Sequence, residues 1–228
     1  MFQQVLSFRL SRFVQMVVAV ALFNAGGLAG SAAAKESIKL VAFGDSLTAG
    51  FGVAPRDAFP AQLQAALIAR GHKVEVVNAG VSGDTASAGL ERFDWAVPDD
   101  ADAVILELGA NDALRGIDVA ATSATMDAIM RRLAARKLPV LVAGMRAPKN
   151  WGSGYAAQFD AIFPALVKKY DALLYPFFLD DVVMDAALNQ GDGIHPTGAG
   201  IKVIVARILP QVEALIARVA AVRAAAVK

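Results

Sequence analysis

Two polar segments far apart in the chain carry residue types that together could cleave an ester bond. The segment Gly44-Asp45-Ser46-Leu47 follows an apolar run, and a serine at the point where a strand breaks into a turn is a candidate nucleophile. His195 lies three residues after Asp192, which is typical of a general base with its orienting carboxylate. The chain holds only two histidines, and His72 reads as an exposed turn residue. We therefore expect Ser46, His195 and Asp192 to act together.

Other residues that could do chemistry have simpler interpretations. Asp45 could be a nucleophile of the aspartyl-phosphate kind, but no partner motif supports this, and we expect it to hold its turn. The acidic residues around Asp180 suggest a solvated helix face, and the absence of cysteine removes the common thiolate ligands for zinc. The glycines from Gly44 to Gly52 lack the lysine of a phosphate-binding loop and the spacing of a dinucleotide fingerprint. We expect no metal and no cofactor.

The first 34 residues have the layout of a secretory signal peptide. Arg9 and Arg12 precede an apolar stretch, and small residues ending at Ala34 come before charge resumes at Lys35. This order predicts cleavage after Ala34 and export, to the periplasm in a bacterium. An uncleaved anchor is the alternative, because the chain is uncharged from Phe13 to Ala34. The glycines near the end of this stretch make it a poor membrane-spanning helix.

Residues 35–228 have the length of one ordinary domain. Without the two leader arginines the formal net charge changes from +1 to −1, so no basic excess indicates a nucleic-acid partner. With no cysteine, the core must hold the fold without disulfides. We expect a monomer that binds a small molecule and has no stable membrane span once the leader is removed.

Strands and helices alternate along this domain. Apolar runs predict five strands, and residues at helical spacing predict the intervening helices. This order indicates a parallel sheet with helices on both faces. The expected strands are 38–43, 73–77, 102–108, 139–145 and 172–176, and the expected helices are 59–70, 120–136, 155–169 and 198–222.

Four polar segments fall where such a sheet binds ligands, at the carboxyl ends of its strands. They begin at Gly44, Asn78, Gly109 and Asp192. Each alone could be an ordinary turn, because turns use Gly, Asn and Asp. Four of them at one edge, together with the Ser/Asp/His set, indicate an active site.

In order and separation these segments resemble the conserved blocks of the SGNH (GDSL-type) hydrolases, including bacterial arylesterases and enzymes with thioesterase, protease and lysophospholipase activity. The likeness extends over nearly all of residues 35–228, and one departure is Ala110, where the family often has glycine. The resemblance implies a flavodoxin-like three-layer α/β/α sandwich with about five parallel strands. It also implies an oxyanion hole formed by the N–H groups of Ser46 and Gly80 and the amide of Asn111.

The activity implied is hydrolysis of carboxylic esters or thioesters through an acyl-enzyme on Ser46. Acyl esters and lysolipids are the expected substrates. The alternatives are a carbohydrate acetyl-esterase, which needs only a small acyl pocket, and a non-catalytic binding module on the same fold. Every catalytic position is filled, which argues against the binding module.

The loop after the expected fourth strand is a candidate wall for the acyl group. Pro148, Trp151 and Tyr155 offer apolar area there, while Gly152 and Gly154 would allow the loop to adapt. We expect these three apolar residues to contact a medium or long acyl chain.

Overall fold

The computed structural model describes residues 37–226, so the predicted leader lies outside the described residues. Five parallel strands form one sheet in the order β2-β1-β3-β4-β5. This confirms the predicted number and direction of the strands. Their bounds are β1 Ile38–Gly44, β2 Val74–Gly80, β3 Ala103–Glu107, β4 Val140–Ala143 and β5 Leu173–Tyr175.

Burial along the strands follows their position in the sheet. All residues of β3 and β4 are buried, because helices cover both faces of a central parallel strand. In the edge strand β2, Val74 and Val76 are buried while Glu75 is exposed. The continuous apolar runs of the sequence therefore mark the centre of the sheet.

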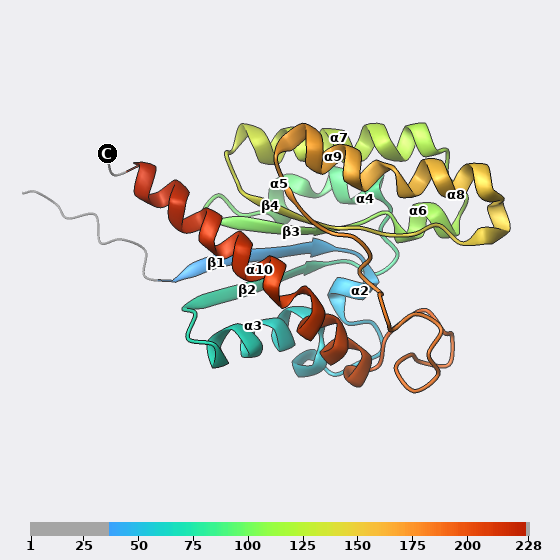
Figure 1. Ribbon diagram of the computed structural model, residues 1–228, viewed down its shortest axis with the longest axis horizontal. Coiled ribbons are helices and arrows are strands. Elements are labelled where there is room, and N and C mark those ends of the chain that lie inside the picture. Colours follow the sequence, from blue (N-terminus) through green and yellow to red (C-terminus); the bar gives the residue numbers. More distant parts are fainter. Residues whose placement is uncertain (1–36, 227–228) are drawn as a thin grey trace, which may run out of the picture. The chain divides into compact units, whose positions relative to one another are not determined.

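Helices cover both faces of the sheet, as the three-layer α/β/α expectation requires (Figure 1). One face carries α3 (Phe59–Ala69) and α10 (Gly198–Ala226), which pack on each other. The other carries α4 (Ala86–Glu91), α7 (Val119–Ala135) and α9 (Ile162–Tyr170). Within residues 37–226, no helix combines the length and hydropathy needed to cross a membrane.

One helix that we predicted as continuous is interrupted in the structure. The expected helix 155–169 is two helices, α8 (Ser153–Asp160) and α9, separated at Ala161. Pro164 explains the break, because it has no N–H to donate to the carbonyl of Asp160 and its ring crowds that carbonyl. The helical periodicity continues across Ala161 because this residue keeps helical backbone angles and both helices pack on α7.

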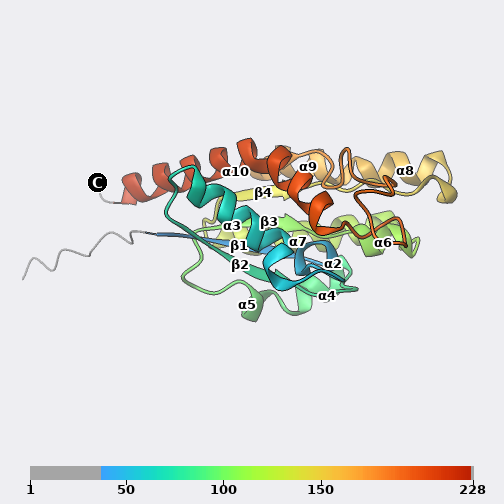
Figure 2. The same cartoon turned by 90° about the horizontal axis from the view of Figure 1, so that it is seen from below.

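The polar loops that follow β1, β2 and β3 lie at one edge of the sheet, at the point where the order of the strands reverses. The chain runs from β1 outward to β2 and then returns to β3 on the other side of β1, which opens a crevice at the carboxyl ends of β1 and β3. Gly44 ends β1 in register with both Gly80 and Glu107. Two short helices lie at this end in both views, α2 (Ser46–Ala49) and α6 (Ala110–Leu114) (Figure 2).

Candidate active site

Ser46 is the first residue of α2, directly after the turn that ends β1. Asp45 caps this helix, since its Oδ1 accepts the Leu47 N–H at 3.0 Å, which is the turn-holding role expected for it. Ser46 is 8% exposed, and its N–H donates to no other residue that the structure describes. The four-residue length of α2 limits any helix dipole, so the local N–H group matters more than the helix.

The loop between β5 and α10 brings His195 to the serine. The His195 Nε2 atom lies 2.9 Å from Ser46 Oγ, across a sequence separation of 149. On the other side of the ring, Nδ1 lies 2.6 Å from Asp192 Oδ2. The carboxylate is an acceptor, so Nδ1 carries the proton and Nε2 is free to accept from the serine. The structure therefore brings together all three residues of the predicted set.

The Asp192 carboxylate is held in its ionised form. Its Oδ1 accepts the N–H groups of Ile194 and His195, both at 2.9 Å. These bonds, with the one to the imidazole, lower the pKa of Asp192 to about 2. The charge is therefore present near neutral pH, and it orients the imidazole through two fixed oxygen atoms.

Two residues that sequence reasoning missed hold the His195 loop against the serine turn. The Phe51 and His195 rings lie 4.6 Å apart between centroids. The Gln190 side chain donates to Phe51 O at 2.7 Å and to Pro196 O at 3.1 Å. Neither residue belongs to a motif or has an unusual charge, so no local signal in the sequence points to them.

Gly80, one of the expected oxyanion donors, is the last residue of β2. Its N–H donates to Asn78 Oδ1 at 3.0 Å, so this donor is already used within its own loop. A Cβ at Gly80 would lie 2.3 Å from Ala49 N, which explains the glycine by close packing against α2. An oxyanion at Gly80 would have to replace the bond to Asn78, so the role of Gly80 as a donor stays a prediction.

The following turn offers free donors instead. The N–H groups of Ser82 and Gly83 donate to no residue within the described part of the chain. Gly83 has φ +88°, which L side chains rarely adopt. Its carbonyl accepts from Arg115 Nη2 at 2.9 Å, which holds the turn in place.

Asn111 lies on α6, facing the serine turn. Its Nδ2 lies 3.2 Å from Asp45 Oδ2 and 3.0 Å from Asp84 O. Both contacts are within the protein, so donation to a bound oxyanion requires exchange of at least one of them. The weaker, longer contact is the one to Asp45.

A buried carboxyl group lies beneath the serine turn. Glu107, at the end of β3, is fully buried, and its Oε2 accepts from Thr48 Oγ1 at 2.7 Å and from the Asp45 N–H at 3.3 Å. Its Oε1 has no hydrogen-bond partner among the described residues. Burial, and then the neighbouring Asp45 carboxylate, raise the pKa of Glu107 well above its ordinary value. We assign it as a neutral acid that supports the turn.

The expected acyl-contact residues lie beside α6. The Trp151 Nε1 donates to Ala113 O at 2.8 Å, and the Tyr155 hydroxyl donates to Ile117 O at 2.8 Å. The two rings are neighbours, with centroids 6.3 Å apart. Trp151 remains 45% exposed, and Pro148 is half-buried. The loop is therefore anchored, with apolar area left accessible.

Asp84 and Asp112 bind groups outside the helices that directly follow them. Thr85 caps α4 through a bond to the Ala88 N–H, and the Asp84 carboxylate binds Arg92 instead. Asp112 lies inside α6, and its Oδ2 accepts the Ala86 N–H at 2.8 Å. It therefore caps α4 from a different segment.

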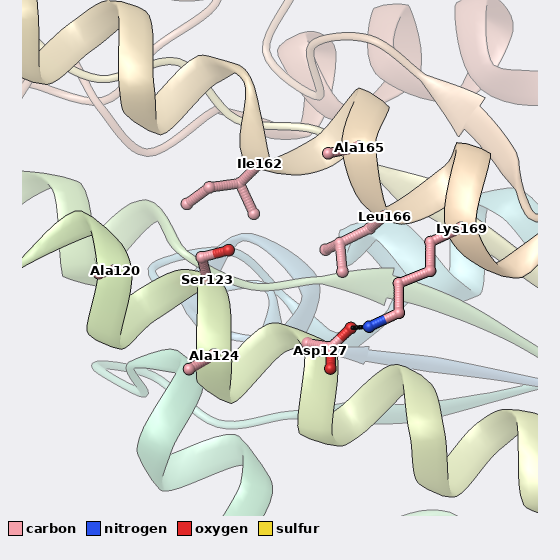
Figure 3. Close-up of a pocket in the computed structure, with 8 residues that line it drawn as sticks. All are labelled: Ala120, Ser123, Ala124, Asp127, Ile162, Ala165, Leu166 and Lys169. Atoms are coloured by element: carbon pink, nitrogen blue, oxygen red, sulfur yellow. Dashed lines mark hydrogen bonds and ion pairs between the residues drawn. The ribbon is translucent and has the colours of Figure 1, made fainter.

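Other parts of the described chain add nothing to this site. Across residues 37–226, no group of three or more His, Cys, Asp or Glu side chains is placed to bind a metal. A hollow of about 420 Å³ lies between α7 and α9 (Figure 3). The ion pair between Lys169 and Asp127, at 2.6 Å, borders it. Neither helix supplies a residue of the Ser46 site.

Comparison with known proteins agrees with this geometry. The model of the GDSL-like lipase/acylhydrolase family matches residues 42–203. The arylesterase of Vibrio mimicus is 35% identical over 170 residues, which are 73% of this chain and 84% of that protein. The thioesterase 1/protease 1/lysophospholipase L1 of Escherichia coli K12 is 38% identical over 158 residues, 69% and 74% of the two chains.

Solved structures agree as well. The crystal structure of AlinE4, an SGNH-hydrolase family esterase, has 44% sequence identity and a TM-score of 0.67, and the match covers 78% of this chain and 96% of that one. A serine joined through a histidine to an aspartate, on a fold shared with such enzymes, excludes the alternative of a non-catalytic module. The chain belongs to the GDSL-like lipase/acylhydrolase family, and it is an ester-hydrolysing enzyme of the SGNH type.

Proposed function

We propose that the enzyme cleaves carboxylic esters and thioesters through an acyl-enzyme formed on Ser46. One observation carries this proposal, the continuous hydrogen-bonded series from Ser46 Oγ to His195 at 2.9 Å and from His195 to Asp192 at 2.6 Å. This geometry places a base within reach of the nucleophile's proton and a carboxylate behind the base.

Each half of the reaction uses the same proton carrier. Ser46 Oγ attacks the acyl carbonyl carbon while His195 Nε2 takes the hydroxyl proton. The tetrahedral intermediate collapses, the bond to the leaving alcohol or thiol breaks, and His195 returns the proton to that leaving group. Water then attacks the acyl-serine, His195 takes a proton from the water, and the carboxylic acid leaves as Ser46 recovers its proton.

The oxyanion would be bound by the Ser46 N–H, the Asn111 amide and the N–H of Gly83 in place of Gly80. Three facts support Gly83: its N–H donates to no acceptor within residues 37–226, it has no Cβ to obstruct a substrate, and the next residue's carbonyl lies 3.0 Å from Asn111 Nδ2. A donor that is already paired, as in Gly80, would have to lose a hydrogen bond first.

A phosphonate adduct tests both the nucleophile and the donors. A fluorophosphonate should label Ser46, and Ser46→Ala should be neither labelled nor active. In a crystal structure of the adduct, the phosphonyl oxygen should lie within hydrogen-bond distance of Gly83 N. An oxygen at Gly80 N would reverse the donor assignment, and labelling at another residue would refute the nucleophile.

The substrate we propose has a medium or long acyl chain, as an aryl ester or a lysophospholipid. Relatives named as arylesterase and lysophospholipase support these classes. Exposed apolar side chains at the active-site edge of the sheet support an acyl chain longer than acetyl, and they are Phe51, Leu114 and Trp151. A series of p-nitrophenyl esters from acetyl to palmitoyl tests this length. A maximum of kcat/KM at the acetyl ester would favour the acetyl-esterase alternative.

We also propose that residues 1–34 are removed and that the enzyme acts as a monomer in the periplasm. The arginine–apolar–small-residue order before Lys35 supports this location. This location argues against thioesters of coenzyme A as physiological substrates, since they are cytoplasmic metabolites. N-terminal sequencing of the protein released by osmotic shock should begin at Lys35. Retention of residues 13–34 in a membrane fraction would indicate an anchor instead.

A further inference from the structure

Arg92 is a buried arginine that joins three segments of the active-site edge. It lies between α4 and α5 (Phe93–Ala96), and its side chain is 7% exposed. The guanidinium donates from Nε to Asp84 Oδ2 at 2.5 Å, from Nη1 to Ala79 O at 2.8 Å and from Nη2 to Gly44 O at 2.8 Å. Its centre lies 4.5 Å from the Phe43 ring centroid.

The bond to Gly44 O acts on the peptide just before the nucleophile. The same oxygen also accepts the Val81 N–H at 3.1 Å. At the opposite side of that peptide, the Asp45 N–H lies 3.3 Å from Glu107 Oε2. The Gly44–Asp45 peptide plane is therefore held at both its oxygen and its nitrogen. Because Ser46 follows it, the direction of the Ser46 N–H depends on this plane.

The other two bonds act on the segment between β2 and α4. Ala79 O belongs to the peptide that includes the Gly80 N–H, so the guanidinium sets how that strand end leaves the sheet. The Asp84 carboxylate anchors the far end of the same segment, and Asp84 O accepts from Asn111 Nδ2. Gly83, with its free N–H, lies between these two anchored points. One side chain thus sets the separation of the groups we assign to the oxyanion hole.

We propose that Arg92 is a positioning residue for ester hydrolysis, acting through the backbone of the serine turn and of the loop between β2 and α4. The inference rests on the proposed roles of Ser46, Gly83 and Asn111. A planar guanidinium presents several donors in a fixed fork, whereas an ammonium is a single flexible point of charge. Lysine at this position could keep the charge but could not hold three acceptors in one plane.

The test compares Arg92→Lys with Arg136→Lys. Arg136 is a matched control, because its guanidinium also binds two backbone carbonyls, Val97 O at 2.7 Å and Pro98 O at 2.5 Å. Both carbonyls precede β3, at the opposite end of the sheet from Ser46. Each lysine variant should lower Tm, but only Arg92→Lys should lower kcat, by about 100-fold for a displacement of roughly 1 Å at the donors.

Two further readouts separate positioning from a purely structural role. KM for a p-nitrophenyl ester should change by less than about threefold, since the lost contacts matter in the transition state. Affinity for a boronic acid, which forms a tetrahedral adduct on the serine, should fall by the same factor as kcat. A wild-type kcat in folded Arg92→Lys, or equal losses in Arg136→Lys, would overturn the inference.

If Arg92→Lys does not fold, the variant Asp84→Asn tests the same proposal. It keeps an oxygen acceptor for Arg92 but removes the charge, so kcat should fall by about tenfold with KM unchanged. A wild-type kcat in this variant would count against the proposal. Ser46→Ala, assayed in parallel, distinguishes the two proposals. Activity in Ser46→Ala would refute the proposed function. An inactive Ser46→Ala together with a normal kcat in the Arg92 and Asp84 variants would refute only the role of Arg92.

Discussion

At the scale of single residues, reactivity comes from contacts and not from residue type. A serine hydroxyl is a weak nucleophile until a base removes its proton. Here the base lies 2.9 Å from Ser46 Oγ, and it is oriented by a carboxylate whose pKa is lowered to about 2. Neither His195 nor Asp192 has a function in this reaction without the other.

We expect Ser46→Ala and His195→Ala each to lower kcat by roughly 10⁴-fold or more, and the double variant to lose little further activity. Residues that act as a unit are not additive, because loss of either one disables the same step. The measurement is hydrolysis of a p-nitrophenyl ester. His72→Ala is the matched control and should keep wild-type kcat. Multiplicative losses in the double variant would show that the two residues act separately.

The pH dependence of the reaction should report the loss of the histidine base at low pH. Protonated His195 cannot accept the serine proton, so kcat/KM should fall in acid. The Asp192 carboxylate stays ionised over this range, because its pKa is lowered to about 2. A logarithmic plot from pH 4 to 9 should therefore have a slope of at least about one on the acid side, with any steeper fall reporting the Asp45 carboxyl, whose pKa burial raises to about 6. A flat profile would contradict a histidine base.

At the scale of elements, the site depends on loops held at the ends of strands. β1 and β3 supply the serine turn and α6, and their neighbouring register places Gly44 beside Glu107. The 3-10 helix Lys149–Trp151 follows β4 and is tied to α6 through Trp151 and Ala113. A change in that loop should therefore affect the acyl group more than the catalytic atoms.

We expect Trp151→Ala to lower kcat/KM for an octanoyl ester by roughly tenfold more than for an acetyl ester, since each buried CH₂ contributes up to about 0.8 kcal/mol. The acetyl ester is the internal control, because it uses the same nucleophile and base. Trp151→Phe keeps an apolar ring but loses the bond to Ala113 O, so it should retain most of the chain-length preference. Equal losses on both esters in Trp151→Ala would make this tryptophan a structural residue only.

At the scale of the whole molecule, the buried carboxyl groups beneath the serine turn lower the free energy of unfolding at neutral pH. Glu107 and Asp45 are both fully buried, and burial raises the pKa of Asp45 to about 6 and that of Glu107 well above its ordinary value of 4.5. Between the unfolded and folded pKa values the native state binds more protons than the unfolded chain. The free energy of unfolding therefore decreases as the pH rises through this range.

We expect Glu107→Gln to reduce this loss of stability, because glutamine has no proton to release. Each carboxyl group of this kind contributes a slope of up to about 1.4 kcal/mol per pH unit. Urea unfolding at pH 5 and pH 8 should give a smaller difference for Glu107→Gln than for wild type. The exposed Glu91 provides the control, and Glu91→Gln should keep the wild-type difference. An unchanged difference in Glu107→Gln would mean that Glu107 ionises normally in the folded protein.

The sequence by itself determined the parallel sheet, the polar edge and the identities of Ser46, His195 and Asp192. These features are local: a buried strand requires a continuous apolar run, and a serine turn or an Asp-x-x-His segment is visible in a few residues. The helix break at Ala161 was also encoded locally, by Pro164, although periodicity alone concealed it.

Tertiary structure decided which polar groups are free and which are already paired. The Gly80 N–H is paired because the Asn78 side chain folds back onto it, whereas the Gly83 N–H donates to no described residue. Arg92, Gln190 and Glu107 became part of the site because strand register and loop closure bring Gly44, Phe51 and Thr48 to them. Hydrogen bonding depends on direction and on distances of about 3 Å, and both are set by the packing of segments that are distant in the sequence.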